Sequence, residues 1–278
     1  MQHTTEAEQH ASYFVESGGG FTPTRYAQSH WGDDHLNGPA IVALVARALE
    51  TAFGRAEFQP ARLTVDLFRA ARNALTTVEV TMVRDGRRVH SAECDVVQGD
   101  RIVARATLVQ YRSSSAPPGT LWHADGARPD FPVPDTSMLP YIGSDTVGWT
   151  RTPGEHQNAD RKRFYNDGVA VVPGEPNSPF VRAAMVAEST SLVTNLGTEG
   201  VGYINGDLTV ALSRLPVDEW IGVQADSHHA AGGIAVGTST LFDSAGPFGA
   251  GLTTAIANPA AQIDFSARRF GPEGTGAR

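Results

Sequence analysis

Hydrophobic and polar residues follow nearly the same pattern along two stretches of the chain. Leu63–Arg69 reads LTVDLFR and Leu208–Arg214 reads LTVALSR, so five of the seven positions are identical at an offset of 145 residues. A shared motif followed by a shared apolar register indicates an internal duplication, and its period is that of a small domain. At the same offset, apolar residues match apolar residues in five further pairs: Val78 and Val223, Val89 and Ile234, Val96 and Leu241, Val97 and Phe242, and Val103 and Phe248.

A helix is predicted ahead of each copy of the motif. Residues 40–54 carry apolar side chains at helical spacing, with Asn37 as a plausible N-cap, Pro39 in the first turn and Gly54 at the end. Residues 177–195 form the second predicted helix, with Asn177 or Ser178 as its cap.

The rest of each half predicts antiparallel strands. Asp85–Gly86 lies between two alternating runs in residues 76–97, which is a strong hairpin signal. A helix followed by such a meander, present twice, favours an α+β fold whose two sheets join edge to edge. The other predicted strands lie within residues 13–27, 63–69, 100–112, 161–173, 204–214, 219–229, 232–246 and 247–257.

The two predicted domains are separated by a segment rich in Ser, Pro and Gly. Residues 113–140 contain this segment, whose composition is typical of a linker. We therefore expect an N-terminal domain over residues 1–115, a linker over 116–144 and a C-terminal domain over 145–278.

Composition and charge narrow the classes of function. A net charge of −8 argues against nucleic acid as the main partner, because phosphate binding needs a basic surface. Cys94 is the only cysteine, so no disulfide within the chain is expected. The first residues show no signal peptide, and no apolar run approaches the roughly 20 residues of a membrane span. We expect a cytoplasmic protein with no membrane partner.

The order of these elements resembles a known fold. The long helix entered through a glycine-containing loop, the LTVxLxR strand and the RDG hairpin resemble the hotdog fold. The second half, with AESTS, INGDLTVALSR and LFDSAGPFG, resembles the type II acyl-CoA thioesterases, which carry two hotdogs in one chain. The resemblance implies a tandem (double) hotdog, each part a long helix wrapped by an antiparallel sheet.

The resemblance also implies a set of catalytic positions. In that family a carboxylate on the helix, a Thr or Asn on the next strand and a Gln on the last strand hold the hydrolytic water. These positions fall on Glu188, where Asp is usual, on Asn205, and on Thr253 or Thr254, where no Gln stands.

The residues themselves single out Glu188. Val181, Met185, Glu188 and Leu192 share one face of the predicted helix, and a carboxylate among apolar residues is costly unless it is paired or used. The position 145 residues earlier is Ala43, so the charge occurs in one copy only. We expect Glu188 to lie between the two halves with a raised pKa, unless it reaches solvent at the edge of the stripe.

Several other residues are candidates for substrate binding. Helix N-termini can supply oxyanion donors, at Asn37–Gly38 or at Asn177–Ser178, although an ordinary cap and loop would give the same sequence. Asn205 and Asp207 are expected on the strand face opposite Leu208, or just before the strand. His228 could line the site, but it cannot chelate a metal with its neighbour His229 because adjacent strand residues point to opposite faces.

Some sites and activities are disfavoured. We interpret Asp33-Asp34-His35 as solvated loop residues and expect no metal site. No GxSxG, P-loop or dinucleotide motif is present, which argues against a serine esterase and a nucleotide-binding enzyme.

The prediction is an acyl-CoA thioesterase-like hydrolase of fatty acid metabolism that cleaves an acyl-CoA with an activated water and needs no cofactor. The alternatives are another hotdog enzyme, such as an enoyl-CoA hydratase, and a non-catalytic acyl-CoA-binding protein. Exposed sheet faces also predict a homo-oligomer of these chains.

Overall fold

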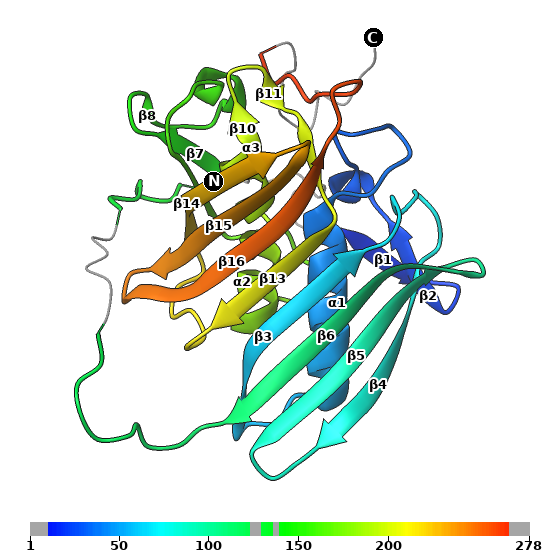
Figure 1. Ribbon diagram of the computed structural model, residues 1–278. Coiled ribbons are helices and arrows are strands. Elements are labelled where there is room, and N and C mark those ends of the chain that lie inside the picture. The colour runs from blue at the N-terminus through cyan, green and yellow to red at the C-terminus, as the bar shows by residue number, and fades with distance from the viewer. Residues whose placement is uncertain (1–10, 123–128, 136–138, 267–278) are drawn as a thin grey trace, which may run out of the picture.

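The computed structural model describes residues 11–122, 129–135 and 139–266 of the chain. A single antiparallel sheet of 12 strands dominates this part, and α1 and α2 pack together behind its central strands (Figure 1). The first half of the chain supplies β1 (Phe14–Ser17), β2 (Gly20–Pro23), a short 3-10 turn (Arg25–Ala27), α1 (Gly38–Phe53), β3 (Phe58–Leu67), β4 (Thr77–Asp85), β5 (Val89–Gln98) and β6 (Arg101–Arg112).

The second half repeats this order with additions. Its strands β7 (Tyr141–Ser144), β8 (Gly148–Thr150) and β9 (Lys162–Asn166) extend the edge of the sheet. They are followed by α2 (Pro179–Ala187), α3 (Thr190–Asn195), β10 (Leu196–Gly197), β11 (Gly200–Val201), β12 (Tyr203–Asn205), β13 (Asp207–Leu212), β14 (Ile221–Ala231), β15 (Ile234–Asp243) and β16 (Gly246–Ala257), with a 3-10 turn at Pro153–His156.

The strand boundaries reproduce the offset seen in the sequence. β5 and β15 begin and end 145 residues apart (234 − 89 and 243 − 98), and so do β6 and β16 (246 − 101 and 257 − 112). β3 likewise matches the stretch from the start of β12 to the end of β13 (203 − 58 and 212 − 67). The helices do not keep this offset, because their N-caps Asn37 and Ser178 lie 141 residues apart (178 − 37).

The two copies of the motif form the seam of the sheet. β3 and β13 pair antiparallel, with Leu63 opposite Val210 and Val65 opposite Leu208. These four side chains are buried and face the helices, as period-two alternation requires. Thr64 and Thr209, which are equivalent in the duplication, face each other with their hydroxyls 3.1 Å apart.

The first predicted helix and the hairpins are confirmed, whereas the second helix is interrupted. α1 is capped by the side chain of Asn37 and ends at Gly54. The β4–β5 hairpin lies at the predicted turn, and β1 and β2 pair within the stretch 13–27 where strands were predicted. The predicted helix over 177–195 is instead α2 and α3, separated at Glu188 and Ser189.

Part of the expected linker packs against the sheet. β7 lies within the stretch 116–144 yet pairs with β9. Phe131 stacks on Tyr165 at 4.7 Å between ring centroids, and a Cβ on Gly222 would overlap its ring. Phe131 therefore covers one end of the sheet, a role that the Ser, Pro and Gly content of this stretch did not suggest.

Because β3 and β13 pair across the two halves, we expect the two halves to unfold together in one transition. We expect Leu208→Ala to lower the free energy of unfolding by about 2–5 kcal/mol, because Leu208 is 1% exposed and the substitution leaves a cavity between both halves. Leu252→Ala is the matched control, since Leu252 is 40% exposed and should cost about 0.5 kcal/mol or less. Urea unfolding followed by circular dichroism would contradict the expectation if both variants lost equal stability, or if Leu208→Ala destabilised one half alone.

Candidate active site

Glu188 lies at the break between α2 and α3. Its backbone N–H bonds to Met185 O and that of Ser189 bonds to Val186 O, so the helix tightens to a 3-10 turn at this point. Thr190 and Thr194 donate their hydroxyls to the carbonyls of Ala187 and Thr190. Hydroxyl groups that bond back to the helix in this way bend it, which accounts for the interruption.

The Glu188 side chain points against the start of α1. It is 8% exposed, and a Cβ on Gly38 would overlap its Oε1 atom. Only glycine lets the first residue of α1 approach the carboxylate this closely. The carboxylate is thus held between the two halves, as the sequence predicted.

Gly38 carries a backbone donor that the helix leaves unused. The first N–H groups of a helix have no partner within it. In α1 the next residue is Pro39, which has no N–H, and the N–H of Ala40 donates to Asn37 Oδ1 at 2.8 Å. The Gly38 N–H therefore remains available beside Glu188. Asn37 itself is committed to the scaffold, because its Nδ2 donates to the carbonyls of Tyr26 and Gln28.

Asn205 is the polar partner of Glu188. Its Nδ2 donates to Glu188 Oε1 at 3.1 Å. Burial raises the pKa of Glu188 to about 7, while the hydrogen bond from Asn205 lowers it. A carboxyl group with such a pKa exchanges its proton near neutral pH, which suits it to general acid–base chemistry.

Tyr13 is a neighbour of Glu188 that sequence reasoning missed. Its pKa is raised by burial and by the nearby charge of Glu188, so the phenol stays protonated. The segment around it crosses to the second half, because the N–H groups of Tyr13 and Phe14 donate to the carbonyls of Ala170 and Val171. No pattern near Tyr13 in the sequence indicates this long-range contact.

Asn205 and Asp207 lie on opposite faces of the sheet, which corrects the expectation that they share one. Asn205 pairs with Ala255, whereas Thr209 pairs with Leu252, so the register shifts by one residue around Gly206. Such a bulge reverses the side-chain alternation. Asn205 therefore faces the helices together with Leu208, and Asp207 faces away.

Thr253 and Thr254 are engaged with Asp207 rather than with Glu188. The N–H of Thr254 donates to Asp207 Oδ1 at 2.8 Å, and its hydroxyl donates to Oδ2. Thr253 donates its hydroxyl to the carbonyl of Asp207 at 2.9 Å. Asp207 thus anchors β13 to β16, and the hydrogen bonds of the two threonines tie them to Asp207, not to Glu188.

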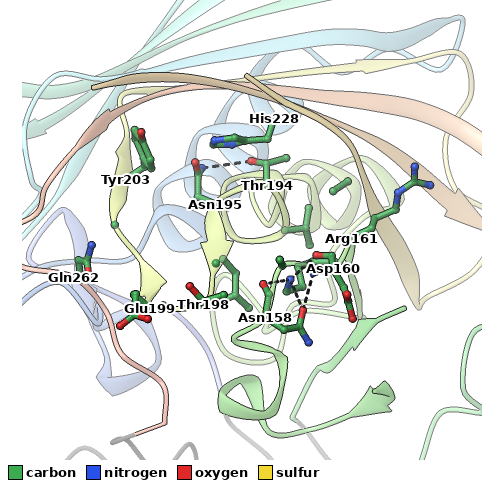
Figure 2. A pocket seen from close by; sticks show the side chains of 18 of the residues that line it. Asn158, Asp160, Arg161, Thr194, Asn195, Thr198, Glu199, Tyr203, His228 and Gln262 are labelled. Atoms are coloured by element: carbon green, nitrogen blue, oxygen red, sulfur yellow. Dashed lines mark hydrogen bonds between the residues drawn. The ribbon is translucent and has the colours of Figure 1, made fainter. Parts of the chain in front are cut away.

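His228 lies in a cavity of about 620 Å³ at the end of α3 (Figure 2). Its ring contacts that of Tyr203 edge to face, with 5.8 Å between centroids. Tyr203 and Asn205 alternate on β12, so they point to the same face of the strand.

The start of α2 is a different environment from the start of α1. Asn177 bonds to the backbone of Val169 and Val171, and Ser178 caps α2 while donating to Glu50. The Glu50 carboxylate therefore faces the N-terminus of α2, as the Glu188 carboxylate faces that of α1. From the 145-residue offset, the sequence had placed the counterpart of Glu188 at Ala43. With the 141-residue offset of the helices the counterpart is Arg47 (188 − 141), which pairs with Glu16 and Glu175.

In the part of the chain that the structure describes, no three His, Cys, Asp or Glu side chains gather closely enough to hold a metal ion. Asp33 and Asp34 are exposed loop residues. None of the described helices has the length and apolar character needed to cross a membrane.

Comparisons with known proteins agree with this geometry. Residues 27–111 match the family model of the acyl-CoA thioesterase N-terminal domain, and residues 136–252 match that of the C-terminal domain. No curated protein matches the chain significantly.

Solved structures show the same fold. The tesB protein of Mycobacterium avium subs paratuberculosis is 18% identical with a TM-score of 0.60, and the match covers 88% of this chain and 96% of that one. Acyl-CoA thioesterase II TesB2 from Mycobacterium marinum is 18% identical with a TM-score of 0.58, over 79% and 90% of the two chains. A protein from Alicyclobacillus acidocaldarius described as having a hot dog fold is 16% identical with a TM-score of 0.62, over 92% and 99%. The chain thus has a hotdog-type α+β fold.

The buried carboxylate should make stability depend on pH. Because the pKa of Glu188 is raised from 4.5 to about 7, the folded chain keeps a proton that the unfolded chain loses in this window. Stability therefore falls as pH rises from about 4.5 to 7, by on the order of 3 kcal/mol.

Glu188→Gln should remove this part of the pH dependence. The measurement is the free energy of unfolding in urea at pH 5 and pH 8 for both proteins, with Glu79→Gln on the exposed side of β4 as the control. Parallel pH profiles for the wild type and Glu188→Gln would show that Glu188 does not titrate as described.

Proposed function

Because this chain belongs to the acyl-CoA thioesterase family, it is a thioester hydrolase, and we propose that Glu188 is the base that activates its water. The observation that supports this assignment is the buried Glu188 carboxylate, held by Asn205 on one side and by the start of α1 on the other. A thioester can be hydrolysed by a positioned water, a proton acceptor and a donor for the oxyanion, without a covalent nucleophile.

The reaction proceeds by attack of water on the thioester carbonyl carbon. Asn205 occupies Glu188 Oε1, which leaves Oε2 to take a proton from the attacking water. The C–O bond forms and the carbonyl oxygen becomes an oxyanion. When the C–S bond breaks, Glu188 returns its proton to the leaving thiolate, so the products are a carboxylic acid and a thiol.

The oxyanion is stabilised by the start of α1. The Gly38 N–H has no partner within the helix, and the positive end of the helix dipole lies at the same place. A backbone donor fixed before the reaction needs no reorganisation as charge develops. The Gln that the family carries on its last strand is absent here, so Asn205 is the side-chain amide that positions Glu188.

At the level of the whole chain, we propose a double hotdog. Its N-terminal domain would span residues 1–115 and its C-terminal domain 145–278, joined by 116–144, with the β7 part of that stretch belonging to the second domain. The equal strand boundaries at the 145-residue offset support this division. We further propose that the protein acts in the cytoplasm on fatty acyl-CoA and forms homo-oligomers.

Loss of the base should abolish turnover while keeping the shape of the site. Glu188→Gln is expected to lower kcat by about 10²–10⁴, the usual contribution of a general base. Thiol release from a series of acyl-CoA substrates measures this rate, and Glu79→Gln should keep the wild-type value. Wild-type turnover by Glu188→Gln would rule out Glu188 as the base. If the wild type binds acyl-CoA without cleaving it, the alternative of a non-catalytic acyl-CoA-binding protein is favoured instead.

The pH–rate profile should respond to Asn205. In the wild type the rate should rise through a pKa of about 7, because the base must be ionised. Asn205→Ala removes the hydrogen bond that lowers this pKa, so the rising limb should move to higher pH. The rate of the variant should therefore recover partly at alkaline pH. A limb that stays in place or moves to lower pH would contradict the role given to Asn205.

A further inference from the structure

The buried phenol of Tyr13 has no part in the mechanism above, although it lies beside the proposed base. Its side chain belongs to the apolar core, and the residue as a whole is 6% exposed. Burial and the nearby charge of Glu188 raise the pKa of the phenol, so its O–H keeps the proton at neutral pH. Tyr13 therefore offers a neutral hydrogen-bond donor next to the carboxylate.

The hydroxyl of Tyr13 makes no hydrogen bond to any residue that the structure describes. It is Asn205 that donates to Glu188 Oε1. Nor is the hydroxyl one of the fully enclosed, unpartnered polar atoms of the described residues, so a ligand can reach it. Tyrosine hydroxyls at the edge of a core usually find a partner. The free hydroxyl of Tyr13 is therefore available to a bound substrate.

The backbone of Tyr13 is tied to the start of α1. Its carbonyl accepts a hydrogen bond from the N–H of Thr24 at 2.8 Å, and Thr24 caps the 3-10 turn that follows it. That turn ends at Ala27, whose carbonyl accepts from the N–H of Asn37 at 2.7 Å. Asn37 in turn caps α1 directly before Gly38. One short stretch of backbone thus holds Tyr13 and Gly38 on the same scaffold.

Addition of water moves negative charge from Glu188 to the carbonyl oxygen of the substrate. A C–O bond forms, the π electrons of the carbonyl pass to its oxygen, and Glu188 takes a proton from the water. A donor bonded to Glu188 stabilises the charge before this step, whereas a donor beside Glu188 but not bonded to it can act where the charge develops. The Gly38 N–H supplies one hydrogen bond to the new oxyanion, which can accept a second.

We propose that Tyr13 is a further catalytic residue, whose O–H donates the second hydrogen bond to the oxyanion. The inference rests on the proposed function, with Glu188 as the base. The phenol keeps its own proton throughout, so the leaving thiolate still receives its proton from Glu188. A hydrogen bond to a charged oxygen is stronger than one to a neutral carbonyl, so Tyr13 acts on kcat more than on substrate binding.

Tyr13→Phe tests this role, because it removes the hydroxyl and keeps the ring. It should lower kcat by about 10²–10³, the usual cost of losing one oxyanion donor, with KM nearly unchanged. The rising limb of the pH–rate profile should stay in place, because Tyr13 does not bond to Glu188. Unfolding in urea checks that the variant is folded. Tyr111→Phe is the matched control, since Tyr111 is 53% exposed on β6, and it should keep the wild-type kcat.

Thioesters with different leaving groups separate the oxyanion from the leaving sulfur as the target of the phenol. The S-phenyl ester of an acyl group releases a much more acidic thiol than the S-butyl ester of the same group. A donor to the oxyanion should lower kcat/KM for both esters by the same factor when it is removed in Tyr13→Phe. A loss confined to the S-butyl ester would place the phenol at the leaving sulfur and overturn the proposal.

A second variant covers the case in which Tyr13→Phe does not fold. Tyr13→3-fluorotyrosine keeps the shape of the side chain and makes its O–H a stronger donor, because fluorine lowers the pKa of a phenol. Its kcat should rise above the wild-type value. A wild-type kcat in Tyr13→Phe, a shifted pH limb, or a lowered kcat in the fluorinated variant would overturn the role of Tyr13 while leaving hydrolysis established. Wild-type turnover by Glu188→Gln would overturn the proposed function itself, whatever the result for Tyr13→Phe.

Discussion

The pairing of β3 with β13 is the constraint on which the rest of the structure depends. It joins two antiparallel sheets into one and brings both helices to the same side, where α1 and α2 pack together. Only this arrangement places the start of α1 against a residue that follows α2. The contact of Gly38 with Glu188 is therefore a product of the whole fold, although each residue belongs to a simple local element.

Two opposing effects meet at Glu188. Burial favours its protonated form, and the hydrogen bond from Asn205 favours the charged form, with a pKa of about 7 as the result. A more complete hydrogen-bond set would leave the carboxylate ionised and weakly basic, whereas a fully apolar setting would keep it protonated. The amide of Asn205 and the close approach of Gly38 leave the pKa of Glu188 between these two limits, which suits proton exchange at neutral pH.

The sequence predicted the elements that follow from local rules and long-range repetition. The duplication, α1 with its Asn37 cap and the hairpins depend on periodicity and turn residues. The bulge at Gly206 was not predictable, because a one-residue register shift leaves no mark on the apolar pattern, and it moved Asn205 to the opposite face. The contacts of Tyr13 and Phe131 also depend on segments far apart in the chain.

The facing pair Thr64 and Thr209 carries a consequence for the origin of the chain. The two residues occupy the same position in each copy, so the local axis of symmetry passes between them. In an ancestor of half this length, one threonine would have met itself in a second molecule across a twofold axis. Fusion of the two genes would then have freed each copy to diverge. The acid that faces the start of the neighbour's helix is Glu188, bonded to Asn205, in one copy and Glu50, bonded to the cap Ser178, in the other.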